Sequence, residues 1–207
     1  MSVTFVTATG TDVGKTFLTA GMIRYFRDGR ILVDALKPVA TGFDDDAPEW
    51  TDTAVLLGAL GRRTTPEEIE RVSPFRFAAP LSPDMAARRE RRKLDFGELL
   101  EFSRRAVQNH EGQMLIEGVG GIMVPLDDQH TVLDWMIAIN RPVVLVAGSY
   151  LGSISHTLAC LDVLAKRSLE VKAVVVNETP ASTVPMMETM ETMRDRKSTR
   201  LNSSHVK

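Results

Sequence analysis

Short, continuous apolar runs alternate with amphipathic segments along most of the chain. The apolar runs lack polar alternation, which is typical of strands that are covered on both faces. We expect strands at Val3–Thr7, Ile31–Leu36, Met114–Glu117, Pro142–Ala147 and Val171–Asn177. Helical spacing predicts helices at Phe17–Phe26, Asp52–Leu60, Phe96–Gln108 and His156–Lys166. This alternation predicts an α/β fold, with a mostly parallel sheet and helices on both faces of a single domain.

The first expected strand leads into residues 7–16, TATGTDVGKT. A Gly-Lys-Thr sequence between a strand and a helix is typical of a P-loop, in which backbone N–H groups and a lysine hold phosphate and the threonine is placed to ligate Mg²⁺. The usual first glycine of this loop is Thr9 here, and Gly10 comes one residue later. The sequence therefore predicts a P-loop NTPase-like domain that binds a nucleoside triphosphate, although Gly-Lys-Thr can also start a helix by chance.

Two further charged residues stand where expected strands end. Lys37 follows the second strand, while Glu117 closes the third and is followed by Gly118. Ligands of parallel sheets bind at this end of the strands. We interpret Lys37 either as a second phosphate-facing lysine or as a lysine that extends to solvent at the sheet rim. Glu117 is interpreted as a Mg²⁺-holding carboxylate or as a turn residue.

Three other positions carry weaker signals. Asp52 is an acid in the first turn of an expected helix, where the helix dipole alone favours it. Ser82 before Pro83 predicts a helix start, and such an N-terminus can also take an anion. Asn177 closes the fifth strand, and its amide suits either the edge of an adenine or a turn.

Composition narrows the class of protein. A chain of 207 residues suits one domain with a sizeable core, and a net charge of −2 argues against a general nucleic-acid binder. No apolar run has the length of a membrane span, and the N-terminus lacks the features of a signal peptide. The single cysteine, Cys160, cannot form an internal disulfide and is interpreted as a packing residue. These features predict a cytoplasmic protein.

The ordered set of motifs resembles the dethiobiotin synthetases, the ATP-dependent ring-closing enzymes of biotin synthesis. The matching stretches are Val6–Thr16, Lys37–Val39 with Thr41–Gly42, Ser82–Pro83 with Ala86–Ala87, Glu117–Gly121 with Val124–Pro125, Leu151–Leu158 and Asn177–Glu178. The resemblance implies that CO₂ and 7,8-diaminononanoate form a carbamate, that ATP phosphorylates it, and that the second amine closes the ring to give dethiobiotin, ADP and phosphate.

The resemblance also implies residue roles. Lys15 and Lys37 are expected to be catalytic, by stabilising the transferred phosphoryl group and the carbamate. Nucleotide contacts are expected from Thr11, Asp12, Val13, Gly14, Lys15, Thr16, Glu117, Gly118 and Asn177. Mg²⁺ ligands are expected at Thr16, Asp52 and Glu117, and substrate contacts at Thr41, Gly118 and Ser155. The family further implies a homodimer in which the loop 151–158 contributes to diamine sites near the subunit interface.

The chain departs from the family pattern in places. Ala8 replaces a common glycine, Asp84 a frequent histidine, and Ser155 a common asparagine. Residues 197–207 show no apolar periodicity and resemble translated sequencing-adapter read-through. We therefore expect a domain at residues 1–196 that lacks the family's last strand and helix, and a non-native tail at residues 197–207.

The main alternative is a partner-regulated switch ATPase, like the partitioning ATPases of chromosomes and plasmids. Those proteins share the fold and the Gly-Lys-Thr sequence. They carry an extra lysine early in the loop, where this chain has Gly10, and they lack the Lys37–Val39 and Ser82–Pro83 blocks. These differences favour the biotin-synthesis enzyme.

Overall fold

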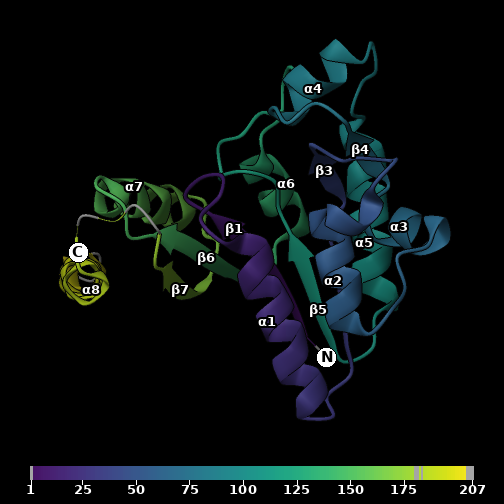
Figure 1. The fold of residues 1–207 in the computed structure, drawn as a ribbon. Coiled ribbons are helices and arrows are strands. Elements are labelled where there is room, and N and C mark those ends of the chain that lie inside the picture. Colours follow the sequence, from purple (N-terminus) through teal and green to yellow (C-terminus); the bar gives the residue numbers. More distant parts are fainter. Residues whose placement is uncertain (1, 180–181, 183, 204–207) are drawn as a thin grey trace.

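A computed structural model describes residues 2–179, 182 and 184–203. Its centre is a five-stranded sheet in the order β2-β5-β1-β6-β7, and all neighbouring strands in it run parallel (Figure 1). The strands are β1 (Ser2–Ala8), β2 (Val33–Leu36), β5 (Gln113–Glu117), β6 (Val143–Gly148) and β7 (Val171–Asn177). All five expected strands are present. The second was predicted two residues too long, because Ile31 and Leu32 are apolar but exposed.

Helices cover both faces of the sheet. Successive residues of β5 show this, because their side chains point to opposite faces. Leu115 packs among residues of α1 (Lys15–Asp28) and α2 (Asp52–Leu60). Ile116 belongs to the larger core on the other face, to which α5 (Phe96–Asn109), α6 (Val132–Ile139) and α7 (Ser153–Lys166) contribute. The predicted α/β architecture is thus confirmed.

A second, smaller sheet was not predicted. It pairs β3 (Val39–Thr41) in parallel with β4 (Phe75–Phe77), and only Lys37 and Pro38 separate β3 from the end of β2. The same region holds a one-turn 3₁₀ helix, η1 (Pro48–Trp50), and the short helices α3 (Pro66–Val72) and α4 (Pro83–Arg89). Strands of three residues give no readable apolar pattern. Because β3 continues directly from β2, this small sheet lies beyond the carboxyl edge of the main one.

The helix start predicted at Ser82 and Pro83 is confirmed by α4, whereas α6 and α8 (Met186–Ser203) were missed. In α6, apolar side chains dominate and most of them are buried, so the segment has no polar face that would reveal a helical period. Helix α8 packs on α7 and β7, and it includes the first part of the expected non-native tail. The foreign origin of residues 197–207 stays a prediction. None of the helices in the described parts of the chain is both long and apolar enough to cross a membrane.

Candidate active site

The strand order brings distant charged residues together. Strands β2, β5 and β1 are neighbours, so Lys37 after β2, Glu117 at the end of β5 and the loop 9–14 after β1 share one edge of the sheet. Asn177 ends β7, on the other side of that loop. Carboxyl ends of parallel strands form the usual ligand site of such sheets.

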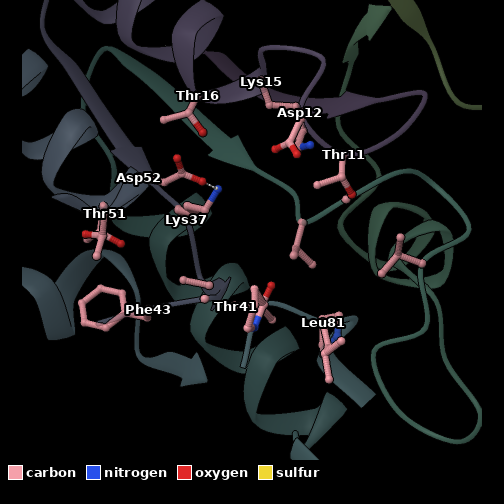
Figure 2. Close-up of a pocket in the computed structure, with 18 of the residues that line it drawn as sticks. Thr11, Asp12, Lys15, Thr16, Lys37, Thr41, Phe43, Thr51, Asp52 and Leu81 are labelled. Atoms are coloured by element: carbon pink, nitrogen blue, oxygen red, sulfur yellow. Dashed lines mark ion pairs between the residues drawn. The ribbon is translucent and has the colours of Figure 1, made fainter. Parts of the chain in front are cut away.

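Lys37 lies in a buried ion-pair cluster. Its Nζ atom is 2.6 Å from Glu117 Oε1 and 2.7 Å from Asp52 Oδ2 (Figure 2 shows the pair with Asp52). Lys37 is 5% exposed and Glu117 is fully buried, so the interpretation of Lys37 as a lysine extending to solvent is wrong. Asp52 is more than a first-turn acid favoured by the helix dipole, because it pairs with Lys37.

The ion pairs keep Lys37 and Asp52 charged. Burial by itself lowers the pKa of Lys37, but the carboxylates of Glu117 and Asp52 outweigh it and raise that pKa above its usual value. Burial likewise favours a raised pKa for Asp52, yet the charge of the Lys37 ammonium and its hydrogen bond hold that pKa below its usual range. Lys37 and Asp52 therefore remain ionised around neutral pH.

The pKa of Lys15 is shifted in the opposite direction to that of Lys37. Lys15 is 7% exposed, and its Nζ atom donates only to the carbonyl oxygen of Gly10, at 3.2 Å. Burial, and then the positive charge of Lys37, lower the pKa of Lys15 to about 8. Within the described residues, no carboxylate forms an ion pair with it. A buried ammonium without a counter-ion favours an anionic ligand, and the P-loop N–H groups beside it favour a phosphate.

Glu117 and Thr16 place oxygen atoms together beside Lys37. Thr16 Oγ1 donates to Glu117 Oε1 at 2.6 Å, whereas Glu117 Oε2 is buried and has no hydrogen-bond partner in the part of the chain that the structure describes. A buried carboxylate oxygen with no partner is costly unless a ligand completes it. Hydroxyl and carboxylate oxygens from Thr16, Glu117 and the nearby Asp52 suit Mg²⁺. The described residues contain no group of three or more histidine, cysteine or acidic residues that could hold a metal ion.

The side chains of Lys15, Thr16, Lys37 and Asp52 border a cavity of about 740 Å³ (Figure 2). Its walls come from the P-loop with the start of α1, from β3 and the residues after it, from the η1–α2 junction, from the start of α4 and from the loop after β5. The lining residues are Thr11, Asp12, Gly14–Phe17, Lys37, Ala40–Phe43, Trp50–Thr53, Pro80–Pro83, Val119, Gly120 and Val124. A cavity of this size holds a small organic substrate together with phosphate groups.

Most of the predicted site residues border this cavity. The lining includes Thr11, Asp12, Gly14, Lys15, Thr16, Lys37, Thr41 and Asp52, and Glu117 lies beneath it in contact with Lys37 and Thr16. Asn177 lies against the P-loop instead: its Nδ2 atom donates to the Val13 carbonyl oxygen at 3.3 Å. The structure thus gathers the phosphate-facing and metal-facing residues, and holds the expected adenine contact on the other side of the loop.

Three predicted site residues lie elsewhere. Val13 is buried in a small core with Val6 and Val146. The N–H of Gly118 donates to the Val6 carbonyl oxygen at 2.9 Å, and the residues that reach the cavity are the next two. Ser155 is exposed on α7 and is not part of the lining.

Sequence reasoning missed most of the apolar lining. Phe43, Trp50 and Leu81 border the cavity without any motif that marks them. Phe43 comes two residues after Thr41, and Trp50 two residues before Asp52, so closeness to a marked polar residue was the available signal. Cys160 behaves as expected: it packs on the core, and burial raises the pKa of its thiol, which disfavours the reactive thiolate.

Comparison with known proteins gives a consistent family. A family model described as an AAA domain matches residues 2–201. The chain is 45% identical over 194 residues to the ATP-dependent dethiobiotin synthetase BioD of Acidiphilium cryptum (strain JF-5), a match that covers 93% of this chain and 87% of that protein. It is 48% identical over 175 residues to the protein of the same name from Caulobacter vibrioides (strain NA1000 / CB15N), covering 84% and 78%.

Solved structures are more distant. The MinD cell division protein of Aquifex aeolicus matches 94% of this chain and 79% of its own, with 14% sequence identity and a TM-score of 0.48. A likeness this weak carries no argument about function.

Proposed function

The chain belongs to the family of ATP-dependent dethiobiotin synthetases. We propose that 7,8-diaminononanoate binds in its cavity, where it is carboxylated by CO₂ and the product ring is closed at the expense of ATP. The observation that carries this proposal is the pair of buried lysines, Lys15 and Lys37, on one cavity. Among the described residues, no carboxylate pairs with Lys15, while two carboxylates hold Lys37. An ATP phosphate and a carbamate are two anions that must be brought together against their mutual repulsion, and two lysines serve that need.

The reaction has three steps. One amine of the substrate forms a C–N bond to CO₂ and loses a proton, which gives a carbamate. A carbamate oxygen then bonds to the γ-phosphorus of ATP while the bond to the bridging oxygen breaks and ADP leaves. Finally the second amine bonds to the carbamoyl carbon and loses a proton, and phosphate leaves with the electron pair of the broken C–O bond. The protein has to align and neutralise the reactants rather than supply a nucleophile.

Lys37 is positioned to act on the carbamate. An ammonium group has three N–H donors. Glu117 and Asp52 accept hydrogen-bonding contacts from Lys37 at 2.6 Å and 2.7 Å, which leaves one donor for a ligand. The two carboxylates therefore hold the Lys37 ammonium in place and keep it charged without using up its donors. Lys15 and the P-loop N–H groups would hold the β- and γ-phosphates.

Thr16, Asp52 and Glu117 would hold Mg²⁺, because the unpartnered Glu117 Oε2 fits a cation ligand. The ion would offset the negative charge of the phosphates. Glu117→Gln should then weaken Mg²⁺ binding with ATP analogue present, and this is measurable by calorimetry. Thr16→Ser keeps the hydroxyl and is the matched control. Equal Mg²⁺ affinity in Glu117→Gln and the parent would contradict this ligand set.

Asn177 and Ser155 extend the proposal beyond the cavity. The Asn177 amide would contact the adenine, on the other side of the P-loop. Ser155 is exposed and outside the cavity of its own chain, so it would reach the diamine only in a homodimer, from the second subunit. Sedimentation gives the oligomeric state. In a mixture of a Lys37→Met chain with a Ser155→Trp chain, recovery of activity beyond that of either alone would support shared sites.

The deciding experiment is an assay of the purified protein that follows ATP hydrolysis and dethiobiotin formation together. Phosphate release from ATP should require 7,8-diaminononanoate, CO₂ and Mg²⁺ together, and dethiobiotin should appear with it. ATP hydrolysis that ignores the diamine, with no dethiobiotin formed, would favour the switch-ATPase alternative instead.

A further inference from the structure

Two aromatic side chains stand exposed on the lining of the cavity. Phe17 is 73% exposed and Trp50 is 85% exposed, and both border the cavity. Phe17 follows Thr16 at the start of α1. Trp50 ends the single turn of η1, two residues before Asp52. Each aromatic residue is thus tied through the backbone to a residue of the cluster around Lys37 and Glu117.

The members of the cluster differ in their exposure to solvent. The side chains of Lys37 and Glu117 are 6% and 0% exposed, whereas that of Asp52 is 55% exposed. Water therefore reaches the Lys37–Asp52 ion pair from the Asp52 side. Trp50 is two residues from Asp52 along the chain, and both residues line the cavity.

The attachment of Trp50 limits where its side chain can go. The N–H of Trp50 donates to the Ala47 carbonyl oxygen at 3.2 Å, and the Thr51 hydroxyl donates to the Pro48 carbonyl oxygen at 2.7 Å. The turn is therefore closed by its own hydrogen bonds, while the indole has few neighbours. A large apolar surface held at a cavity mouth by an ordered backbone is suited to pack on a ligand that fills the cavity.

We propose that Phe17 and Trp50 pack over the bound reactants and exclude water from the phosphoryl-transfer centre. This inference rests on the proposed function. It adds a role in coupling ATP use to ring closure for two residues outside the polar cluster.

The chemistry explains why exclusion of water matters. The carbamic–phosphoric anhydride can react in two ways. In the productive route, the second amine bonds to the carbamoyl carbon, phosphate leaves and dethiobiotin forms. In the unproductive route, the oxygen of water bonds to phosphorus, the anhydride P–O bond breaks, and carbamate and inorganic phosphate result with release of a proton. The unproductive route consumes ATP without product, so limiting water access raises the yield per ATP.

The test measures phosphate and dethiobiotin in the same reaction mixture of full chain, diamine, CO₂ and Mg-ATP. The parent protein should release about one phosphate for each dethiobiotin, as the stoichiometry of the reaction requires. Trp50→Ala should raise this ratio roughly twofold or more, because water then competes with the amine. Phe17→Ala should act in the same direction, and Trp50→Phe should restore a ratio close to that of the parent.

Tyr25→Ala is the matched control. Tyr25 is an aromatic residue of α1 with 74% exposure, and it does not border the cavity. Its removal should leave the ratio unchanged. A ratio in Trp50→Ala equal to that of the parent, in protein that still makes dethiobiotin, would overturn the inference and leave the proposed function standing. A parent protein that makes no dethiobiotin would refute the proposed function itself.

A subunit contact is the other use that exposed aromatic residues could have. Sedimentation of Trp50→Ala and the parent at equal concentration separates the two cases. An unchanged mass with a raised ratio supports water exclusion. A mass that falls on Trp50→Ala substitution would assign Trp50 to an interface and contradict the inference.

Discussion

The Lys37 ammonium lies 2.6 Å from Glu117 Oε1, and both residues are almost entirely buried. They come from neighbouring strand ends that are far apart in the sequence, and Asp52 completes the cluster from the start of α2. The two carboxylates keep Lys37 charged before any ligand arrives, so removing one partner leaves a buried charge uncompensated.

Lys37→Met should therefore abolish dethiobiotin formation and also destabilise the protein. Removing one partner of a buried ion pair leaves an uncompensated charge and costs about 3–5 kcal/mol. Unfolding in urea measures the loss. The double variant Lys37→Met/Glu117→Gln should recover part of that stability, because neither position of the buried pair then carries a charge, while staying inactive. A double variant no more stable than Lys37→Met would contradict this account of the cluster.

Lys15 should couple nucleotide binding to proton uptake. Its pKa of about 8 in the free protein means that about nine-tenths of Lys15 is neutral at pH 9. A bound triphosphate favours the ammonium form of Lys15 and raises this pKa. Binding at pH 9 should therefore add close to one proton to Lys15, whereas binding at pH 6.5 should add almost none, because Lys15 is already protonated there. Affinity should fall about tenfold per pH unit above 8.

Calorimetry with a non-hydrolysable ATP analogue, in buffers of different ionisation enthalpy, measures that uptake. The phosphates of the analogue are already fully ionised at pH 9, so the proton must enter the protein. Lys15→Met should bind the analogue weakly and without uptake at that pH. Uptake that persists in this variant would assign the titration to a different group.

Gly14 should not tolerate a side chain. Its φ angle is 95°, and an added Cβ would lie 2.3 Å from Asn177 Nδ2. Gly14→Ala should destabilise the fold and prevent nucleotide binding, through strain of about 1–2 kcal/mol in the left-handed backbone plus the collision. Asn177→Ala in the same chain removes the collision, together with the hydrogen bond to the Val13 carbonyl oxygen, and leaves the backbone strain at position 14. The double variant should thus be more stable than Gly14→Ala and less stable than Asn177→Ala in urea unfolding.

Gly118→Ala distinguishes packing from substrate contact. An added Cβ would lie 3.0 Å from the Phe5 ring, and that buried ring is packed edge-on against Trp135. We expect a stability loss of about 1–3 kcal/mol from overpacking and KM values for ATP and the diamine close to those of the parent. A raised KM in a fully stable variant would instead support the substrate contact that the sequence predicted for Gly118.

The main sheet and much of the polar site could be predicted from the sequence. Strands covered on both faces must be apolar throughout, so they stand out as continuous runs. In a parallel sheet all carboxyl ends meet at one edge, so Lys37 and Glu117 could be assigned to a common site without knowing the strand order. The P-loop was recognisable because its glycine, lysine and threonine are adjacent in the chain.

Other features had no local signal. Strands β3 and β4 are too short for a pattern, and α6 lacks the polar face that reveals a helix. The sequence also predicted that Gly118 contacts the ligand. In the structure its N–H donates to the Val6 carbonyl oxygen, and the loop reaches the cavity only at Val119. Which residue of a loop faces a ligand depends on hydrogen bonds to a neighbouring strand, and those are not local.

The sequence by itself determined the fold class, the family resemblance and the phosphate end of the site, because these depend on the order of residues along short stretches. Only the tertiary structure decided that Lys37 is held between Asp52 and Glu117, that Lys15 has no carboxylate partner among the described residues, and that Trp50 is an exposed part of the cavity lining. These relationships set the charge and the water access of the site. They arise between segments that meet only when the chain folds, and the free energy of each charge depends on its burial and on its nearest partner.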